Sequence, residues 1–226
     1  MLKRVLVILL LSIMPPSLAT AQKVTRLPEV DLVLVLAIDC SYSVNADRWA
    51  LQQYGYAGAF RSSAVLNAIA GGYHGSIAVT VMQWAAFAEQ VIDWHILSDR
   101  ESAEIFAKKI EVLPYKPEWT TGVANAITTS VVVLKRAPFN ALRRVIDISG
   151  DGKENAGGMP ATARNFAVSN GITINGLPII AAELDVAQFY ETVVIGGPGA
   201  FSIPVTDMMT FPAAVRRKLV REIAAK

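Results

Sequence analysis

The chain has 226 residues, of which 53% are hydrophobic and 18% are charged, and it contains a single cysteine. This length and apolar content fit a folded domain with a sizeable core and exclude an intrinsically disordered protein. One cysteine also excludes an intramolecular disulfide, so core packing, with or without a bound metal, must stabilise the fold. Because Cys40 ends an apolar run, we expect its thiol to be buried.

A signal peptide is predicted over residues 1–21. A short basic start precedes the apolar segment Val5–Met14, and Ala19-Thr20-Ala21 forms a small-x-small cleavage site. The apolar segment is about half of the ~20 residues that a membrane-spanning helix needs. We therefore expect cleavage after Ala21, no integral membrane span in the mature chain, and a periplasmic or secreted protein.

Cleavage would also change the charge of the chain. Loss of Lys3 and Arg4 leaves 19 basic and 19 acidic residues. Without a general basic field, neither nucleic acid nor anionic lipid is an expected partner. A local basic cluster remains at Arg216-Arg217-Lys218 and Arg221, which we interpret as the solvated face of a C-terminal helix.

Strands and helices alternate along residues 22–226, which we predict to form one domain. In chain order, the predicted elements are a strand at Val30–Asp39, one long or broken helix at Asn45–Ala70, two paired strands at Ser76–Ala85 and Gln90–Ile96, helices at Glu101–Leu113 and Thr121–Leu134, a strand at Arg144–Ser149, a helix at Met159–Asn170, a strand at Ile172–Ile180, a short helix at Asp185–Tyr190, a strand at Ala200–Val205 and a helix at Phe211–Ala225. This order predicts an α/β fold of three layers, with a doubly wound, mostly parallel sheet and helices on both faces.

The first strand ends abruptly in polar residues. Its apolar run stops at Asp39, and Ser41 and Ser43 follow at alternate positions. Polar groups at the carboxyl end of a parallel strand lie where open α/β sheets bind ligands. Carboxylate and hydroxyl oxygens are the donors that hard cations such as Mg²⁺ prefer. The pattern is by itself also typical of helix capping, so a metal site needs further ligands from elsewhere in the chain.

Two later segments provide candidates for those ligands. Thr121 precedes a predicted helix, and the strand Val145–Ser149 is followed by Gly150-Asp151-Gly152. The glycines allow a sharp turn and a close approach of the backbone to an ion. We expect Thr121 and Asp151 to lie at the same edge of the sheet as the first polar segment, and to complete a metal site there.

These three segments resemble the von Willebrand factor type A (vWA) domain. The metal-ion-dependent adhesion site of that family has the pattern Asp-x-Ser-x-Ser, then a threonine, then an aspartate. Asp39, Ser41 and Ser43 match the first element, Thr121 the threonine and Asp151 the final aspartate. The resemblance covers essentially all of the predicted mature chain, with the elements in the same order.

The chain is also similar to an exported bacterial family of this fold that has no established function. The segments that carry this similarity are Arg143–Gly152, Gly171–Ile179 and Val194–Phe201. One loop departs from the vWA pattern, because Trp119-Thr120 occupies positions that usually hold small residues. This departure leaves Thr120 as an alternative to Thr121 as the threonine ligand.

The vWA resemblance implies a divalent cation, with Mg²⁺ favoured and Mn²⁺ or Ca²⁺ as alternatives. It also implies an open coordination position that accepts an Asp or Glu side chain from a protein partner, and aspartates that often act through water. Tyr42, Trp119, Glu154 and Asn155 flank the predicted site and are candidates for contact with that partner. The chain would then be a metal-dependent protein-binding module.

Two other functions stay open. A metal-dependent hydrolase would use the same ion to activate water, and a component of an envelope complex would not depend on the metal. Neither His74 nor His95 lies in a pattern typical of nucleophilic catalysis, and no general base is evident in the sequence. Asp147 lies within a strand, and we interpret it as a structural group. We therefore predict that the chain is not an enzyme.

Overall fold

In the computed structural model of the chain, residues 26–180 and 184–225 are described, and the predicted signal peptide lies outside these ranges. A five-stranded sheet has the order β3-β2-β1-β4-β5. The strands are β1 (Glu29–Asp39), β2 (Ile77–Trp84), β3 (Ala88–Leu97), β4 (Asn140–Gly150) and β5 (Ile172–Pro178). All neighbouring strands are parallel except β2 and the edge strand β3, which pair antiparallel. The predicted doubly wound, mostly parallel sheet is therefore confirmed.

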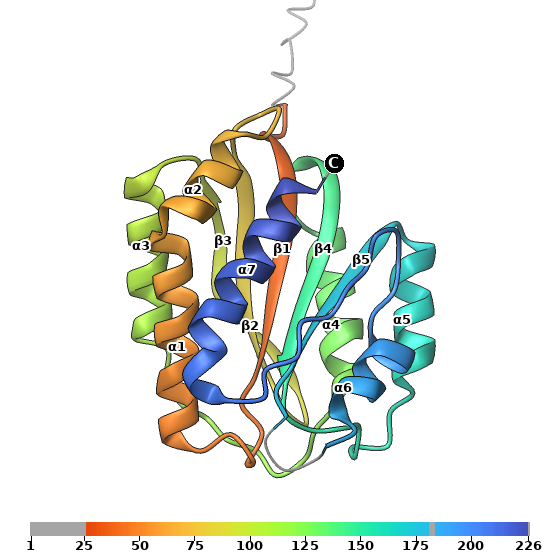
Figure 1. Cartoon of the computed structure of the whole chain (residues 1–226). Helices are drawn as coiled ribbons and strands as arrows, with labels where there is room; N and C mark the ends of the chain where they lie inside the picture. The colour runs from red at the N-terminus through yellow and green to blue at the C-terminus, as the bar shows by residue number, and fades with distance from the viewer. Residues whose placement is uncertain (1–25, 181–183, 226) are drawn as a thin grey trace, which may run out of the picture.

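Helices cover both faces of the sheet (Figure 1). On one face lie α1 (Ala46–Arg61), α2 (Ser63–Ala70), α3 (Arg100–Glu111) and α7 (Phe211–Ala224). The other face is covered by α4 (Val123–Lys135), α5 (Pro160–Ser169), α6 (Val186–Phe189) and the π-helical turn Tyr190–Val194 that continues α6. None of the helices in the described part of the chain is long and apolar enough to cross a membrane.

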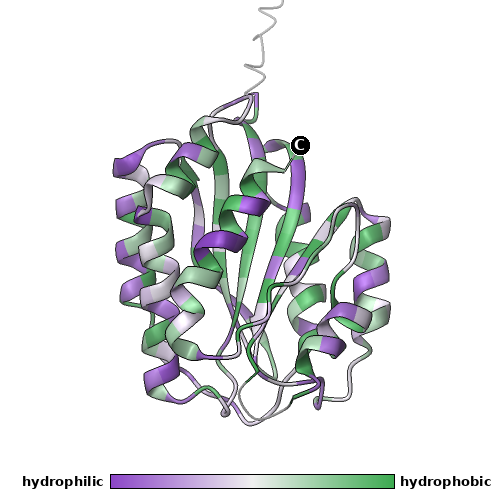
Figure 2. Cartoon of the chain, in the orientation of Figure 1, coloured by the Kyte–Doolittle hydropathy of each residue, from purple (hydrophilic) through white to green (hydrophobic). Residues whose placement is uncertain are grey.

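The central strand β1 is buried on both faces, which explains its nearly continuous apolar sequence. Leu32, Leu34 and Leu36 pack under α1 and α7, whereas Val33 and Val35 pack under α4 and α5. Figure 2 shows the same division, with hydrophobic strands between helices whose outer faces are hydrophilic. This two-sided core holds the carboxyl ends of β1 and β4 side by side.

Of the two alternatives predicted for residues 45–70, one long helix or a broken one, the structure has the broken helix, with the break at Ser62. This residue has an extended backbone, with φ −71° and ψ 141°. Its hydroxyl donates to the Ala59 carbonyl at 2.6 Å and accepts from the Val65 amide at 3.3 Å. One side chain therefore caps the end of α1 and the start of α2, which is typical of serine at a helix boundary.

The predicted strand at residues 200–205 is wrong. This segment forms only isolated bridges beside β5, at Ser202 and Val205. Ile203 and Val205 donate to the Gly176 and Pro178 carbonyls, but Pro178 of β5 has no amide hydrogen to donate back, so the ladder is interrupted between the two bridges. The segment still covers the free edge of β5.

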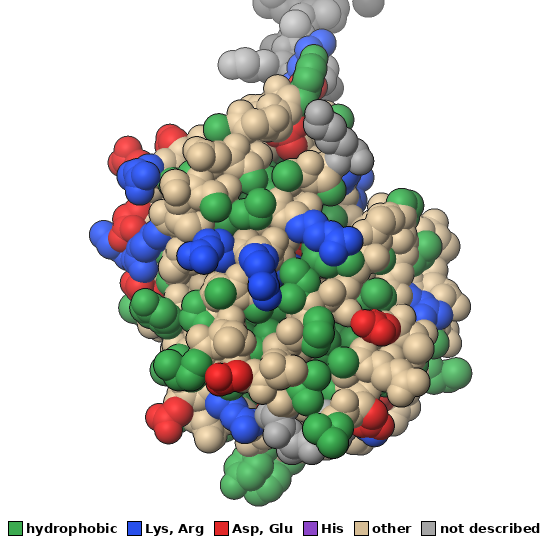
Figure 3. All heavy atoms as spheres, viewed as in Figure 1, with side chains coloured by type: hydrophobic (Ala, Val, Ile, Leu, Met, Phe, Trp, Pro, Cys, Tyr) green, Lys and Arg blue, Asp and Glu red, His purple; other side chains and the backbone are tan. Residues whose placement is uncertain are grey.

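The basic cluster of α7 differs from the predicted solvated face in one residue. Arg216, Arg217 and Arg221 are exposed, and Figure 3 shows Lys and Arg side chains over this helix. Lys218 is fully buried, with its Nζ 2.6 Å from Asp147 Oδ1 and 2.5 Å from Glu222 Oε1. Asp147 is thus a structural group, as its position within a strand predicted.

Candidate metal centre

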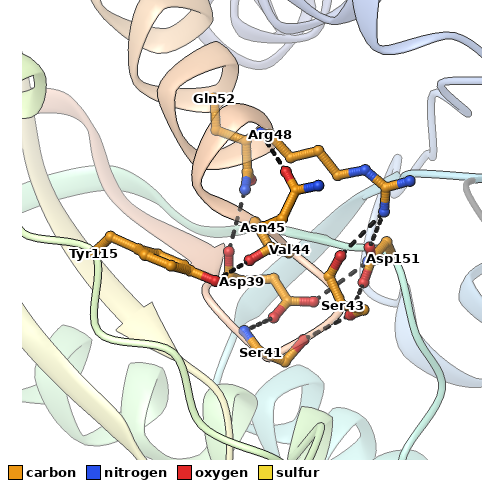
Figure 4. A network of polar contacts seen from close by, with 9 residues as sticks. All are labelled: Asp39, Ser41, Ser43, Val44, Asn45, Arg48, Gln52, Tyr115 and Asp151. Carbon is orange, nitrogen blue, oxygen red and sulfur yellow. Dashed lines mark hydrogen bonds and ion pairs between the residues drawn. The ribbon is translucent and has the colours of Figure 1, made fainter.

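The predicted metal ligands converge at the carboxyl ends of β1 and β4. The Ser43 hydroxyl donates to Asp151 Oδ1 at 2.5 Å and lies 3.1 Å from the Ser41 hydroxyl (Figure 4). Asp39 accepts from the Ser41 amide at 2.7 Å and from the Asp151 amide at 3.3 Å. Segments more than 100 residues apart in the sequence are therefore joined by direct hydrogen bonds at this edge of the sheet.

The loop between β1 and α1 is held in a compact turn. The Val44 amide donates to the Ser41 carbonyl at 2.9 Å, and the Asn45 side chain caps α1 by accepting from the Arg48 amide at 2.9 Å. The Tyr115 hydroxyl donates to the Val44 carbonyl from the neighbouring loop. These contacts fix the backbone of the loop that carries the two serines.

Asp39 lies beneath the other candidate ligands and is fully buried. Burial, followed by the nearby charge of Asp151, raises the pKa of its carboxyl from 3.8 to about 7, against the lowering effect of the Ser41 hydrogen bonds. Both carboxyl groups are buried and lie close together, so their negative charges favour a positive charge beside them. A divalent cation bound between the loops would supply that charge.

Gly150 permits the close packing around Asp39. A Cβ atom at this position would lie 2.8 Å from Asp39 Oδ2, 2.8 Å from Trp84 Cζ2 and 2.8 Å from the Tyr190 hydroxyl oxygen. Real Cβ atoms essentially never approach other atoms this closely, so only glycine fits between these three side chains. The glycine of the predicted motif is therefore required for contact between β4 and the buried carboxylate.

Thr121 reaches the same site from the loop before α4. Thr121 is buried, and its backbone amide donates to the side-chain oxygen of Asn155 at 2.6 Å. Its backbone carbonyl accepts from the Asn155 amide at 3.0 Å. Thr121, unlike Thr120, lines the cavity at the site. This geometry favours Thr121 as the threonine ligand.

Glu154 and Asn155 have a local role that the sequence did not reveal. Glu154 accepts hydrogen bonds from the Ala124 amide at 2.8 Å, in the first turn of α4, and from the Gly158 amide at 3.1 Å. Gly122 begins α4 without a side-chain cap of its own, so Glu154 supplies one from a distant loop. Both residues thereby fix the loop that carries Thr121.

An open cavity of about 230 Å³ lies over the candidate ligands. Its lining comprises Ser41, Tyr42, Ser43, Trp119, Thr121, Asp151, Gly152, Lys153 and Asn155. Four of the five predicted ligands are therefore accessible from one opening, and the fifth, Asp39, lies directly below them. The cavity is large enough for a hydrated ion together with a small acidic group.

An exposed aromatic pair stands at the rim of this cavity. The rings of Tyr42 and Trp119 stack with their centroids 4.1 Å apart, although 59% and 78% of the two residues is exposed. The Tyr42 amide donates to the Glu118 carbonyl at 2.8 Å, and this bond joins the two loops that carry the rings. Large apolar side chains that are exposed yet held in place are typical of contact sites for another molecule.

Arg48 is a component of the site that motif matching missed. Its Nη1 lies 3.1 Å from Asp151 Oδ2 and 3.1 Å from the Ser43 carbonyl oxygen (Figure 4). The metal-site pattern contains no arginine, so a pattern match could not find it. The one indication in the sequence was its place in the first turn of the helix that follows the Asp-x-Ser-x-Ser segment, close to the predicted ligands.

The donor set fits a hard divalent cation. Two carboxylates and three hydroxyls offer oxygen atoms only, which suits Mg²⁺ or Mn²⁺ rather than a thiolate-preferring or imidazole-preferring metal. Within the described ranges, no group of three or more His, Cys, Asp and Glu residues is placed to hold an ion, so the candidate centre depends on its hydroxyl donors. Neither His74 nor His95 lines the cavity.

The fold is that of the vWA domain. Similar solved structures include a von Willebrand factor type A protein from Catenulispora acidiphila, with a TM-score of 0.63 and 14% identity over 86% of this chain and 43% of that one. A second is the vWF domain of the type V pili tip protein Mfa5 from Porphyromonas gingivalis, with a TM-score of 0.61 and 10% identity over 86% of this chain and 95% of the other. These identities establish the fold alone.

A third similar structure is proximal thread matrix protein 1 from the mussel byssus, described with a zinc-occupied MIDAS motif. Its TM-score is 0.60, with 14% identity over 88% of this chain and 49% of that one. The chain thus spans less than half the length of this protein and of the Catenulispora acidiphila protein. No curated protein matches the chain in sequence.

A family match covers nearly the whole described domain. Residues 29–226 match the family described as "Protein of unknown function (DUF1194)". The matched region includes every strand, every helix and all five candidate metal ligands. The chain therefore belongs to the DUF1194 family, and its domain has the vWA fold.

Proposed function

We propose that the protein is an exported, metal-dependent protein-binding module. The observation that carries the proposal is the convergence of five oxygen donors from three distant segments under one open cavity with an exposed aromatic rim. In this proposal Ser41, Ser43 and Thr121 bind Mg²⁺ through their hydroxyls. Asp39 and Asp151 balance its charge, directly or through water.

The remaining coordination position would accept a carboxylate from an Asp or Glu of the partner protein. The ion supplies an electrophilic centre for that carboxylate. The stacked rings of Tyr42 and Trp119 would contact apolar groups next to the acidic residue, because they are exposed and lie at the same opening. The pilus-tip and byssus proteins with this fold are consistent with a role in recognition.

The cavity offers little for hydrolysis. Asp151 is the only carboxylate among its lining residues, and that group already accepts from Ser43 and Arg48. Neither histidine of the chain lines the cavity, so no general base is placed to deprotonate a metal-bound water. A protein-binding module is therefore favoured over the hydrolase.

The first test measures metal binding by the change in melting temperature. Mg²⁺ at about a hundred times its Kd should stabilise the wild-type protein by about 2.7 kcal/mol, which corresponds to roughly 5–10 °C for a domain of this size. Asp39→Asn removes the charge of the buried ligand with little change in shape, so the variant should lose the shift. Asp93→Asn, on the exposed face of β3, is the matched control and should keep it.

The second test identifies the partner. Affinity capture from the exported fraction would compare wild type, Asp39→Asn and Asp93→Asn in the presence of Mg²⁺ or EDTA. Partners retained by wild type and the control in Mg²⁺ alone would support the proposal. Partners captured equally by all three proteins in EDTA would instead favour a structural role in an envelope complex. Turnover of simple ester or phosphate substrates with Mg²⁺ or Mn²⁺ would favour the hydrolase.

A further inference from the structure

Arg48 neutralises one of the two carboxylates at the candidate metal centre. Its guanidinium approaches Asp151 Oδ2, while the Ser43 hydroxyl occupies the other oxygen of the same carboxylate. The Asp151 side chain is 2% exposed and that of Arg48 is 33% exposed, so the pair lies at the boundary between the buried site and solvent. The guanidinium group of an arginine carries a positive charge.

This ion pair changes the charge of the site. Asp39 and Asp151 alone would cancel the charge of a divalent ion. With Arg48 beside them, the loaded site would carry one net positive charge. A net positive site binds the metal more weakly, because the arginine repels it, and attracts a carboxylate more strongly.

No carboxylate besides Asp151 is among the described residues that line the cavity, so none of the lining residues cancels this excess. Lys153 lines the cavity, but its Nζ is 2.9 Å from Asp185 Oδ2. Glu154 directs its carboxylate to backbone amides at the start of α4 and in the following loop. Arg48 is therefore the basic side chain that directly contacts a candidate ligand, Asp151.

We infer that Arg48 couples metal binding to partner binding. In the absence of a partner, the arginine makes the affinity for the metal lower than that of a site with the two carboxylates alone. A carboxylate from the partner then restores the neutral charge of the site. Metal and acidic ligand then bind cooperatively, each raising the affinity for the other by the same factor. This inference rests on the proposed function, because it requires a metal at the site and an acidic ligand on it.

The hydrogen bond to Ser43 could give Arg48 a purely structural role, so the test must separate charge from geometry. Arg48→Gln removes the charge and keeps an amide group that can donate to the Ser43 carbonyl. Arg48→Lys keeps the charge, and Arg48→Met removes both charge and donor. Arg61→Gln is the control, since Arg61 lies on the same helix and pairs with Glu104 and Glu111, away from the site.

The experiment titrates each protein with Mn²⁺ alone and follows free Mn²⁺ by electron paramagnetic resonance. The titration is then repeated with acetate at matched ionic strength. Removing the charge should raise the affinity for Mn²⁺ alone by roughly three- to tenfold in Arg48→Gln and Arg48→Met, as expected for a partly exposed ion pair. Arg48→Lys and Arg61→Gln should stay within about twofold of wild type.

Acetate should raise the Mn²⁺ affinity of wild type more than that of the two neutral variants. The inference is overturned if the neutral variants bind Mn²⁺ no more tightly than wild type, or if Arg48→Lys behaves like them. Circular dichroism identifies any variant that does not fold, and either neutral variant alone is sufficient for the comparison. A folded wild-type protein that binds no Mn²⁺ at all would refute the proposed metal site itself, which is a separate outcome.

Discussion

The buried charge cluster under α7 makes the stability of the domain depend on pH. Lys218 lies between Asp147 and Glu222, and Asn175 donates to Glu222 Oε1 at 2.9 Å. One ammonium group thus faces two carboxyl groups with no access to water. Burial, followed by the charge of Asp147, raises the pKa of Glu222 from 4.5 to about 8, against the opposing effect of Lys218.

The sign of the effect follows from this direction. Well below pH 4.5 the Glu222 carboxyl is protonated in the folded and unfolded chains alike. Its pKa shift therefore does not lower the free energy of unfolding in that range. As the pH rises towards 8, the unfolded chain releases the proton and the folded chain retains it, so the free energy of unfolding falls. At about 1.4 kcal/mol for each pH unit, this single group destabilises the fold by up to about 5 kcal/mol at alkaline pH.

Glu222→Gln should remove that dependence. Glutamine keeps an oxygen that can accept from Asn175 or Lys218, and it carries no ionisable group. The variant should match wild type near pH 4.5 and exceed its free energy of unfolding by several kcal/mol near pH 8. Urea unfolding in EDTA across this pH range measures both proteins without any contribution from metal.

Two controls make this comparison decisive. The raised pKa of Asp39 gives a slope of the same sign, but it contributes equally to both proteins and cancels in the difference. Glu101→Gln, on the exposed face of α3, should leave the slope unchanged. Equal slopes for wild type and Glu222→Gln would refute the assignment of a raised pKa to the buried carboxyl.

Three further predictions concern other positions. Gly150→Ala should lower the melting temperature and abolish the Mg²⁺-dependent shift, because the added Cβ atom would collide with Asp39. Retained Mg²⁺ stabilisation would contradict this. Trp119→Ala should weaken partner binding at least fivefold in a pull-down titration yet leave the Mg²⁺ shift intact, whereas loss of both would indicate a structural role. Asp31→Ala should cost about 1–3 kcal/mol in urea unfolding, since its carboxylate accepts from the His74 and Ser76 amides, and an unchanged midpoint would contradict that role.

Much of the fold could be predicted because the strong signals are local. Buried parallel strands need long apolar runs, and the run that ends at Asp39 could hardly lie anywhere but in the centre of a sheet. The candidate ligands followed from the same rule, because polar residues after such strands meet at one edge. The likeness to vWA domains then supplied the pairing of Thr121 with the other segments.

The remaining features depend on contacts that local sequence does not encode. Lys218 belongs to a basic run that predicts solvent exposure, and its burial is explained by the ion pairs with Asp147 on a facing strand and with Glu222. Arg48 has the sequence context of any exposed helix residue, yet it binds an aspartate 103 residues away. The capping of α4 by Glu154 likewise requires the tertiary fold to bring two loops together.

Cys40 gives the chain a built-in reporter of opening at the candidate site. It is the single cysteine of the sequence, lies between Asp39 and Ser41, and is buried with its thiol 3.5 Å from the Trp84 carbonyl oxygen. Burial raises the pKa of this thiol to about 12, so the folded loop protects it from thiol-specific reagents. The rate of thiol labelling in the native protein therefore measures how often the loop opens, without any engineered probe.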